Sequence, residues 1–116
     1  MNMIRQNEWK PCTPAVTEYD VREFPIVFVQ YWATWNIYDQ GYEVLLSDLR
    51  NKYAQQISFR SCDVDDPATR KLCDGISNVP AIAIFVNGLR HSQMVGMRKI
   101  DVIQGFCEIA AKSITR

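Results

Sequence analysis

The stretch FVQYWATWNIYDQGYEVLL, residues 28–46, joins a strand pattern directly to a helix pattern. The strand pattern begins at Ile26 and ends at Trp32, and Gln30 is its one polar interruption. A nearly continuous apolar run of this length is typical of a strand that is buried on both faces of a sheet. After Asn36 the apolar residues recur with the period of an amphipathic helix. The residues of this predicted apolar face are Tyr38, Tyr42, Leu45, Leu46, Leu49 and Tyr53.

The other segments complete an α/β pattern. Two strands joined through a helix are expected to be parallel, whereas Asn87-Gly88 predicts an antiparallel hairpin. The fold class is therefore α/β, with a mixed central sheet of parallel strands plus a C-terminal hairpin, and with helices on both faces. Further strands are predicted over 57–64, 81–86 and 89–95, a short helix or turn over 15–23, and helices over 68–73 and from 99 or 100 to 113. The last helix is predicted to bury Ile100, Ile103, Phe106, Cys107 and Ala110.

Composition narrows the function classes. The chain has 116 residues, of which 47% are hydrophobic, and one domain is expected over 1–116, with 1–14 as an irregular lead-in that has room for a short edge strand. The net charge is zero, which argues against nucleic acid and anionic membranes as partners, because both attract a clustered positive field. The first residues lack an apolar signal segment, and no apolar run approaches the ~20 residues of a membrane span. We therefore expect a cytoplasmic protein.

The cysteines carry no familiar motif. Cys12, Cys62, Cys73 and Cys107 are widely spaced, and His91 is the single histidine. This spacing excludes a CxxC pair and a Cys/His zinc site, so we predict no metal and no cofactor. Scattered thiols in a cytoplasmic protein are usually free. A disulfide between Cys62 and Cys73 is the alternative.

Three short motifs resemble the thioredoxin family in order and spacing. They are WATW at 32–35, DVDD at 63–66 and VP at 79–80, and the likeness extends over about residues 20–113. The resemblance implies the thioredoxin fold, with Pro80 as the cis-proline beside the start of the long helix.

The departures from that family concern its chemistry. Redox-active members carry Trp-Cys-Gly-Pro-Cys, whereas this chain has WNIYD at 35–39, with Asn36 and Asp39 at the two cysteine positions. Thiol–disulfide exchange needs a thiolate, and Asn36 and Asp39 are instead suited to cap the helix and offset its dipole. Gln30 replaces the family's buried carboxylate, which removes a desolvation cost while keeping hydrogen-bonding capacity. The site is therefore expected to be degenerate and redox-inactive.

The resemblance also implies a groove for extended peptide. Exposed aromatic residues and methionine make an adaptable surface for a protein partner, and the backbone at Val79 is suited to β-augmentation. Two alternatives remain open: a redox protein that uses Cys12, Cys62 or Cys73, and a domain whose groove is closed by its own side chains. Carried over position by position, the groove residues are Trp35, Ile37, Tyr38, Val79, Pro80, Gly96 and Met97.

Overall fold

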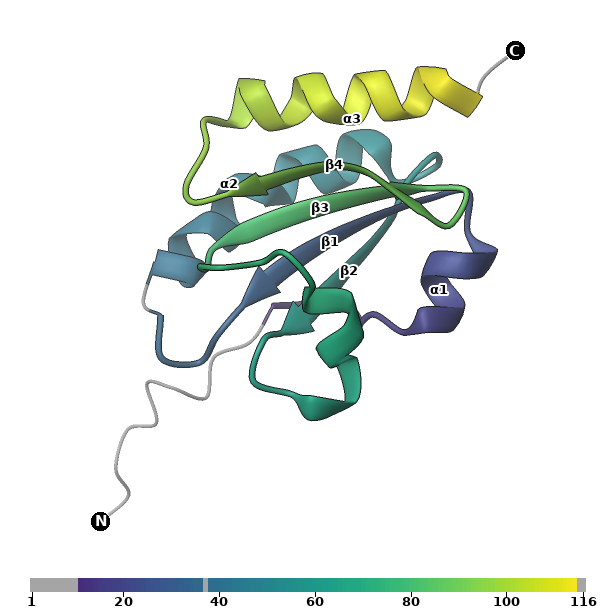
Figure 1. The fold of residues 1–116 in the computed structure, drawn as a ribbon. Coiled ribbons are helices and arrows are strands. Elements are labelled where there is room, and N and C mark those ends of the chain that lie inside the picture. Colours follow the sequence, from purple (N-terminus) through teal and green to yellow (C-terminus); the bar gives the residue numbers. More distant parts are fainter. Residues whose placement is uncertain (1–10, 37, 115–116) are drawn as a thin grey trace.

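One mixed sheet organises the chain. The computed structural model describes residues 11–36 and 38–114, with the backbone alone at 38–40. Four strands pair in the order β2-β1-β3-β4, and helices lie on both faces of the sheet (Figure 1). This is the predicted α/β architecture. In chain order the elements are α1 Glu18–Glu23, β1 Ile26–Trp32, α2 Tyr38–Tyr53, β2 Ser58–Asp63, the 3₁₀ helix η2 Pro67–Cys73, β3 Ala81–Val86, β4 Leu89–Val95 and α3 Ile100–Ile114.

Strand directions follow the predicted connections. β1 is parallel to β2 and antiparallel to β3, and β3 pairs antiparallel with β4. Between β3 and β4, Asn87 and Gly88 have φ angles of 52° and 86°, the positive values that a type I′ hairpin turn requires. The Val79–Pro80 peptide bond is cis, as the resemblance implied.

β1 supplies side chains to two separate cores. Ile26 and Phe28 pack in a cluster with residues of α2 and α3, whereas Val27, Val29 and Tyr31 pack in a cluster with residues of α1 and η2. Successive side chains of a strand point to opposite faces of its sheet. This alternation explains why all seven residues of β1 are buried.

Three predictions about individual positions were wrong. Leu45 is 47% exposed and Ile100 is 36% exposed. Leu45 lies about 100° around the helix from Leu46, so only one of the two faces the sheet. Ile100 is the first residue of α3, where the helix end is open to solvent. Phe106 is only half-buried, although it packs against the cluster of α2 and α3.

Element ends depend on local hydrogen bonds. Helix α1 begins at Glu18 because Thr17 and Asp20 form a capping box. The short edge strand envisaged within 1–14 does not occur at residues 11–14, and residues 1–10 lie outside the described part of the chain. Ala15 forms an isolated parallel bridge with Ser61. The Asp66 carboxylate accepts a hydrogen bond from the Ala68 N–H at 2.9 Å and caps η2 as the sequence indicated.

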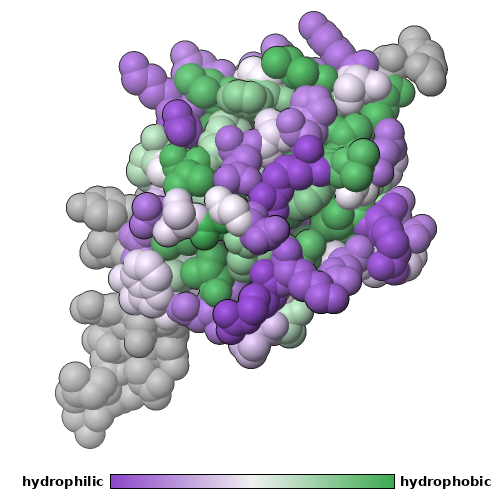
Figure 2. All heavy atoms as spheres, viewed as in Figure 1, coloured by the Kyte–Doolittle hydropathy of each residue, from purple (hydrophilic) through white to green (hydrophobic). Residues whose placement is uncertain are grey.

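Large apolar side chains are exposed in several places. Figure 2 shows hydrophobic residues in separate groups, with hydrophilic residues between them, over the face in view. Scattered exposed apolar residues are ordinary on protein surfaces, so geometry has to decide which of them mark a site. The exposed large apolar residues are Tyr19, Trp35, Val44, Leu45, Leu89, Met97, Ile100, Val102 and Ile109.

Candidate functional site

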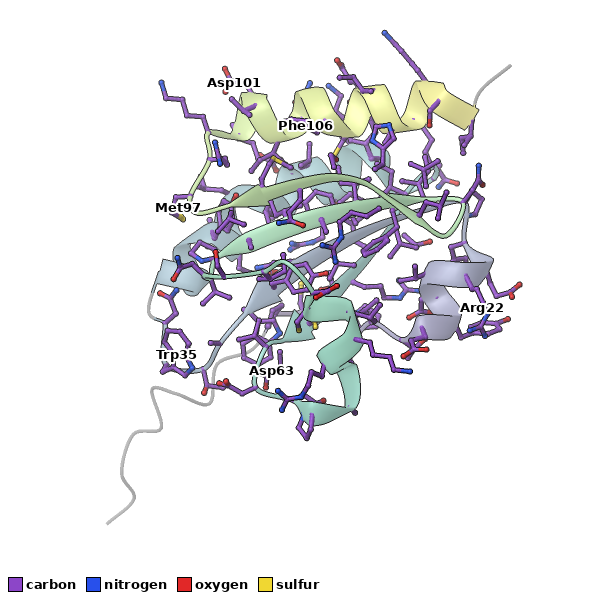
Figure 3. All side chains as sticks on the ribbon, viewed as in Figure 1. Arg22, Trp35, Asp63, Met97, Asp101 and Phe106 are labelled. Atoms are coloured by element: carbon purple, nitrogen blue, oxygen red, sulfur yellow. The ribbon has the colours of Figure 1, made fainter. Side chains whose placement is uncertain are left out.

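Sheet register brings three distant segments to one edge. Tyr31, near the end of β1, pairs with Ala81 at the start of β3, and Ala81 pairs with Val95 at the end of β4. The loops that follow β1, precede β3 and follow β4 therefore meet. In Figure 3, Trp35 and Met97 lie at this end of the molecule, and Arg22 of α1 lies at the opposite end.

Trp35 is exposed but held. Its side chain is 66% exposed, and its indole N–H donates a hydrogen bond to the Asp65 carboxylate at 2.8 Å. Beside it is a small pocket of about 80 Å³. One polar atom thus fixes the ring while its apolar faces stay available. The pocket is lined by Trp35, Val64, Ile76, Ser77, Asn78 and Val79.

Asn36 reaches across to the cis-proline loop. Its side-chain amide donates a hydrogen bond to the Val79 carbonyl at 2.7 Å. The position of the family's first cysteine is therefore tied to the residue that precedes the cis bond. Sequence reasoning assigned Asn36 to a helix cap and missed this contact, because the two residues are 43 positions apart. Capping by Asn36 and Asp39 stays a prediction, and the Asp39 side chain lies outside the described residues.

The cis-proline and the glycine loop are joined through the backbone. The Gly96 N–H donates to the Pro80 carbonyl at 2.8 Å, and Gly96 has a φ of 93°, a left-handed value that favours glycine. Met97 is 50% exposed, whereas Pro80 is buried. Of the predicted groove residues, Trp35, Val79, Gly96 and Met97 keep accessible surface, and Trp35 and Val79 line the same pocket. Ile37 and the side chain of Tyr38 lie outside the described residues.

Gln30 is buried on the strand that leads to the groove. It is 2% exposed, and its amide nitrogen has no hydrogen-bond partner within the described residues. Gln30 keeps its hydrogen-bonding capacity, but this nitrogen does not use it within the described residues. A neutral amide still avoids the larger cost of burying a charged carboxylate.

The side chains that the structure describes form no cluster of metal ligands. Within 11–36 and 38–114, no three His, Cys, Asp or Glu side chains are grouped to hold a metal ion. Over the same part of the chain, every helix is too short or too polar to cross a membrane.

None of the four cysteines lines the pocket beside Trp35, although the Cys73 carbonyl accepts a hydrogen bond from the N–H of Ile76 in the pocket wall at 2.9 Å. The sulfurs of Cys62 in β2 and Cys73 at the end of η2 are 3.6 Å apart, and both are free thiols. Burial raises the pKa of the Cys62 thiol, and that of Cys107, from 9.0 to about 12. Cys12 is exposed, and its thiol donates to the Glu43 carboxylate at 3.0 Å, which is the main reason that its pKa is raised. Cys12, Cys62 and Cys107 are therefore protonated at neutral pH.

Known proteins share this fold and part of this sequence. Thioredoxin C-2 of Corynebacterium nephridii is 27% identical over 82 residues, which are 71% of this chain and 76% of that protein. A thioredoxin variant from Halobacterium salinarum superposes with a TM-score of 0.73 at 17% identity, covering 95% of this chain and 96% of that one. Oxidised mitochondrial thioredoxin 3 of Saccharomyces cerevisiae superposes with a TM-score of 0.68 at 18% identity, covering 88% and 95%.

Sequence and architecture converge on one family. The family model for thioredoxin matches residues 10–108, which include the WATW segment, the DVDD segment and the cis-proline. This chain belongs to the thioredoxin family.

Proposed function

We propose that this chain is a single-domain thioredoxin-family module that binds a protein or an extended peptide in the groove beside Pro80, without thiol–disulfide catalysis at that site. The observation that carries the proposal is the state of Trp35, which is 66% exposed and yet fixed by Asp65 next to an apolar pocket. Holding a large aromatic side chain in place before binding reduces the entropy that a complex loses. Tryptophan is also among the residues that most often dominate binding energy.

Backbone pairing gives the groove a second means of recognition. The Val79 carbonyl already accepts the Asn36 amide at 2.7 Å. A carbonyl oxygen has two lone pairs, so an N–H of a bound peptide can still pair with it. In this arrangement the peptide adds its backbone to Val79 and its side chains to the pocket of Trp35 and Ile76.

The absence of catalysis follows from positions 36 and 39. Neither Asn36 nor Asp39 provides a sulfur to attack a disulfide. The second candidate function is redox catalysis by other cysteines, and the observation in its favour is the short Cys62–Cys73 separation. Cys62 is 1% exposed, so a protein disulfide has poor access to its sulfur. Burial also raises the pKa of Cys62, so little of it is in the thiolate form that attacks a disulfide. A cytoplasmic location stays a prediction.

Peptide selection followed by matched variants tests the binding proposal. Peptides selected from a display library on the intact protein are measured for affinity against wild type, Trp35→Ala and Tyr19→Ala. Tyr19 is an aromatic residue of α1 with similar exposure, 59%, at the far end of the molecule. Trp35→Ala is expected to weaken binding by roughly 30-fold or more, and Tyr19→Ala by less than about twofold. Equal losses in the two variants, or none in either, would contradict the proposal.

Insulin reduction with dithiothreitol tests the claim of inactivity. The wild-type protein is expected to leave the rate at that of the reductant alone. A rate above this blank that disappears in Cys73→Ser would establish the second candidate function.

A further inference from the structure

A pair of thiols occupies the face of the sheet opposite α2 and α3. Cys62 belongs to the cluster formed by β1, α1 and η2, and Cys73 packs against it. Their sulfurs are 3.6 Å apart, and a disulfide bond is about 2.05 Å long. The sulfurs therefore need to approach each other by roughly 1.5 Å for the bond to form.

Thr69 contacts both thiols. The Cys62 thiol donates to the Thr69 hydroxyl at 3.4 Å, and the Cys73 thiol donates to the Thr69 carbonyl at 3.6 Å. These are weak hydrogen bonds between neutral groups, so little is lost when they break. They also hold the two sulfurs facing one residue of η2.

A cavity gives the pair room and access. Cys62 and Thr69 line a space of about 240 Å³, together with Trp32 of β1, Asp63 at the end of β2 and Asp66. A sulfur beside a cavity can shift without displacing a core element. Cys73 does not line this space but is only half-buried, whereas Cys62 is 1% exposed, so Cys73 is the more accessible of the two residues.

Hydrogen bonds from the sheet hold the end of η2 in place. The Tyr31 hydroxyl donates to the Leu72 carbonyl. From β4, Arg90 donates to the Asp74 carbonyl, and the Gln93 amide donates to the Gly75 carbonyl at 2.8 Å. The residues on both sides of Cys73 are thus anchored, which keeps its sulfur near Cys62 in the reduced protein.

We propose that Cys62 and Cys73 are a dithiol site that peroxide converts to an intramolecular disulfide linking β2 to η2. The Cys73 thiolate attacks one peroxide oxygen, the O–O bond breaks, and Cys73 becomes a sulfenic acid as the first water, or an alcohol from an alkyl peroxide, departs. The Cys62 sulfur then attacks the Cys73 sulfur, the S–O bond breaks, and a second water leaves. The two thiols together lose two electrons and two protons, which the peroxide takes up. A dithiol reductant reverses the reaction by exchange.

Mapping of disulfides after peroxide treatment tests the site. In a Cys12→Ser/Cys107→Ala background only the Cys62–Cys73 pair remains, since the chain has four cysteines. Excess hydrogen peroxide is expected to remove both remaining thiols and to link the tryptic peptides 61–70 and 72–90, with the protein still monomeric. The thermal midpoint is expected to rise by roughly 5–10 °C, because the bond restrains a loop in the unfolded chain, and dithiothreitol should return it.

Two matched measurements keep the test decisive. Adding Cys73→Ser to the same background should abolish both the linked peptides and the shift of the midpoint, while the fold survives because Cys73 is half-buried. If the background variant does not fold, the same peptides are sought in the wild-type protein. Persistence of both thiols, loss of thiols without the 61–70 to 72–90 link, or links only between molecules would each overturn the proposal.

Discussion

The groove beside Pro80 and the thiol pair beneath η2 are opposite in character. The groove presents an exposed aromatic residue, Trp35, at a cis-proline, and its family cysteine positions hold Asn36 and Asp39. The pair presents two sulfurs 3.6 Å apart, of which Cys62 is 1% exposed. In the two proposals, recognition and sulfur chemistry therefore use different residues of this chain.

The two regions differ because each chemistry needs a different environment. A reactive thiolate needs exposure and positive potential, which the start of a helix supplies. In this chain that place is taken by an amide that donates to the Val79 carbonyl at 2.7 Å. The buried Cys62 has a sulfur but forms little thiolate at neutral pH, because burial raises its pKa to about 12. We therefore expect neither region alone to perform rapid thiol–disulfide exchange.

Cysteines placed at both family positions of the groove should give the groove thiol–disulfide activity. In the variant Asn36→Cys/Asp39→Cys, insulin reduction with dithiothreitol is expected to rise roughly tenfold or more above wild type, because a thiol at a helix N-terminus has a lowered pKa and more thiolate at pH 7. Asn36→Cys alone is the matched control. It supplies a nucleophile without the second thiol that resolves the mixed disulfide, so it should turn over far less. A double variant no faster than wild type would mean that the groove has lost more than its sulfurs.

Unfolding at alkaline pH should show whether the two buried thiols have raised pKa values. Folding raises the pKa of Cys62 and of Cys107 from 9.0 to about 12. Above about pH 9 the unfolded chain therefore binds fewer protons than the folded protein, so the free energy of unfolding falls with pH. The stabilisation is complete below about pH 9, and each thiol contributes a slope of about 1.4 kcal/mol per pH unit as the pH rises toward about 12.

Variants assign that slope to individual thiols. Urea unfolding between about pH 8.5 and about pH 9.5, where tyrosines of unfolded chains are still mostly protonated because their pKa is about 10, should show a shallower fall for Cys62→Ala and for Cys107→Ala than for wild type. Cys12→Ser is the comparison for an exposed thiol, whose pKa is raised mainly by its hydrogen bond to Glu43 and not by burial. A slope that is the same in all four proteins would show that the two buried thiols titrate normally.

The fold was accessible from sequence because its signals are local. The apolar run of β1 and the turn at Asn87-Gly88 each lie within a few residues of the chain, and both features were located correctly. The wrongly predicted positions lie where neighbouring apolar residues both fit the helical period. Leu45 and Leu46 are both apolar, and only the packing of α2 on the sheet determines that Leu46 is buried and Leu45 is 47% exposed.

The details of the site depend on contacts between distant residues. The Trp35–Asp65 hydrogen bond spans 30 positions and the Asn36–Val79 hydrogen bond spans 43. No periodicity in a single sequence encodes such pairs. The WATW, DVDD and VP motifs pointed to the segments that meet, but not to which atoms bond. The pairing of Cys62 with Cys73 was one option among several, and the structure brings these sulfurs together as free thiols.

The smallest predicted effect compares two buried tyrosines on opposite faces of the sheet. Tyr31 and Tyr42 are both fully buried. The Tyr31 hydroxyl donates to the Leu72 carbonyl in η2. The Tyr42 hydroxyl lies near the Arg98 backbone, which offsets part of the rise in its pKa on burial, but forms no hydrogen bond of normal geometry within the described residues. A tyrosine-to-phenylalanine change removes the same hydroxyl group at either position, but the expected changes in the free energy of unfolding are opposite in sign.

Tyr31→Phe is expected to lower the free energy of unfolding by about 1–2 kcal/mol, because the Leu72 carbonyl loses its short hydrogen bond inside the protein. Tyr42→Phe should be neutral or stabilising by up to about 1 kcal/mol, because it removes a buried hydroxyl that is not satisfied. Urea unfolding with an unchanged m-value measures both. Since Tyr31 anchors the end of η2, Tyr31→Phe should also slow closure of the Cys62–Cys73 disulfide, whereas Tyr42→Phe should not. Equal closure rates in the two variants would mean that the sulfurs are held together without the help of Tyr31, and that Arg90 and Gln93 are sufficient to anchor the end of η2.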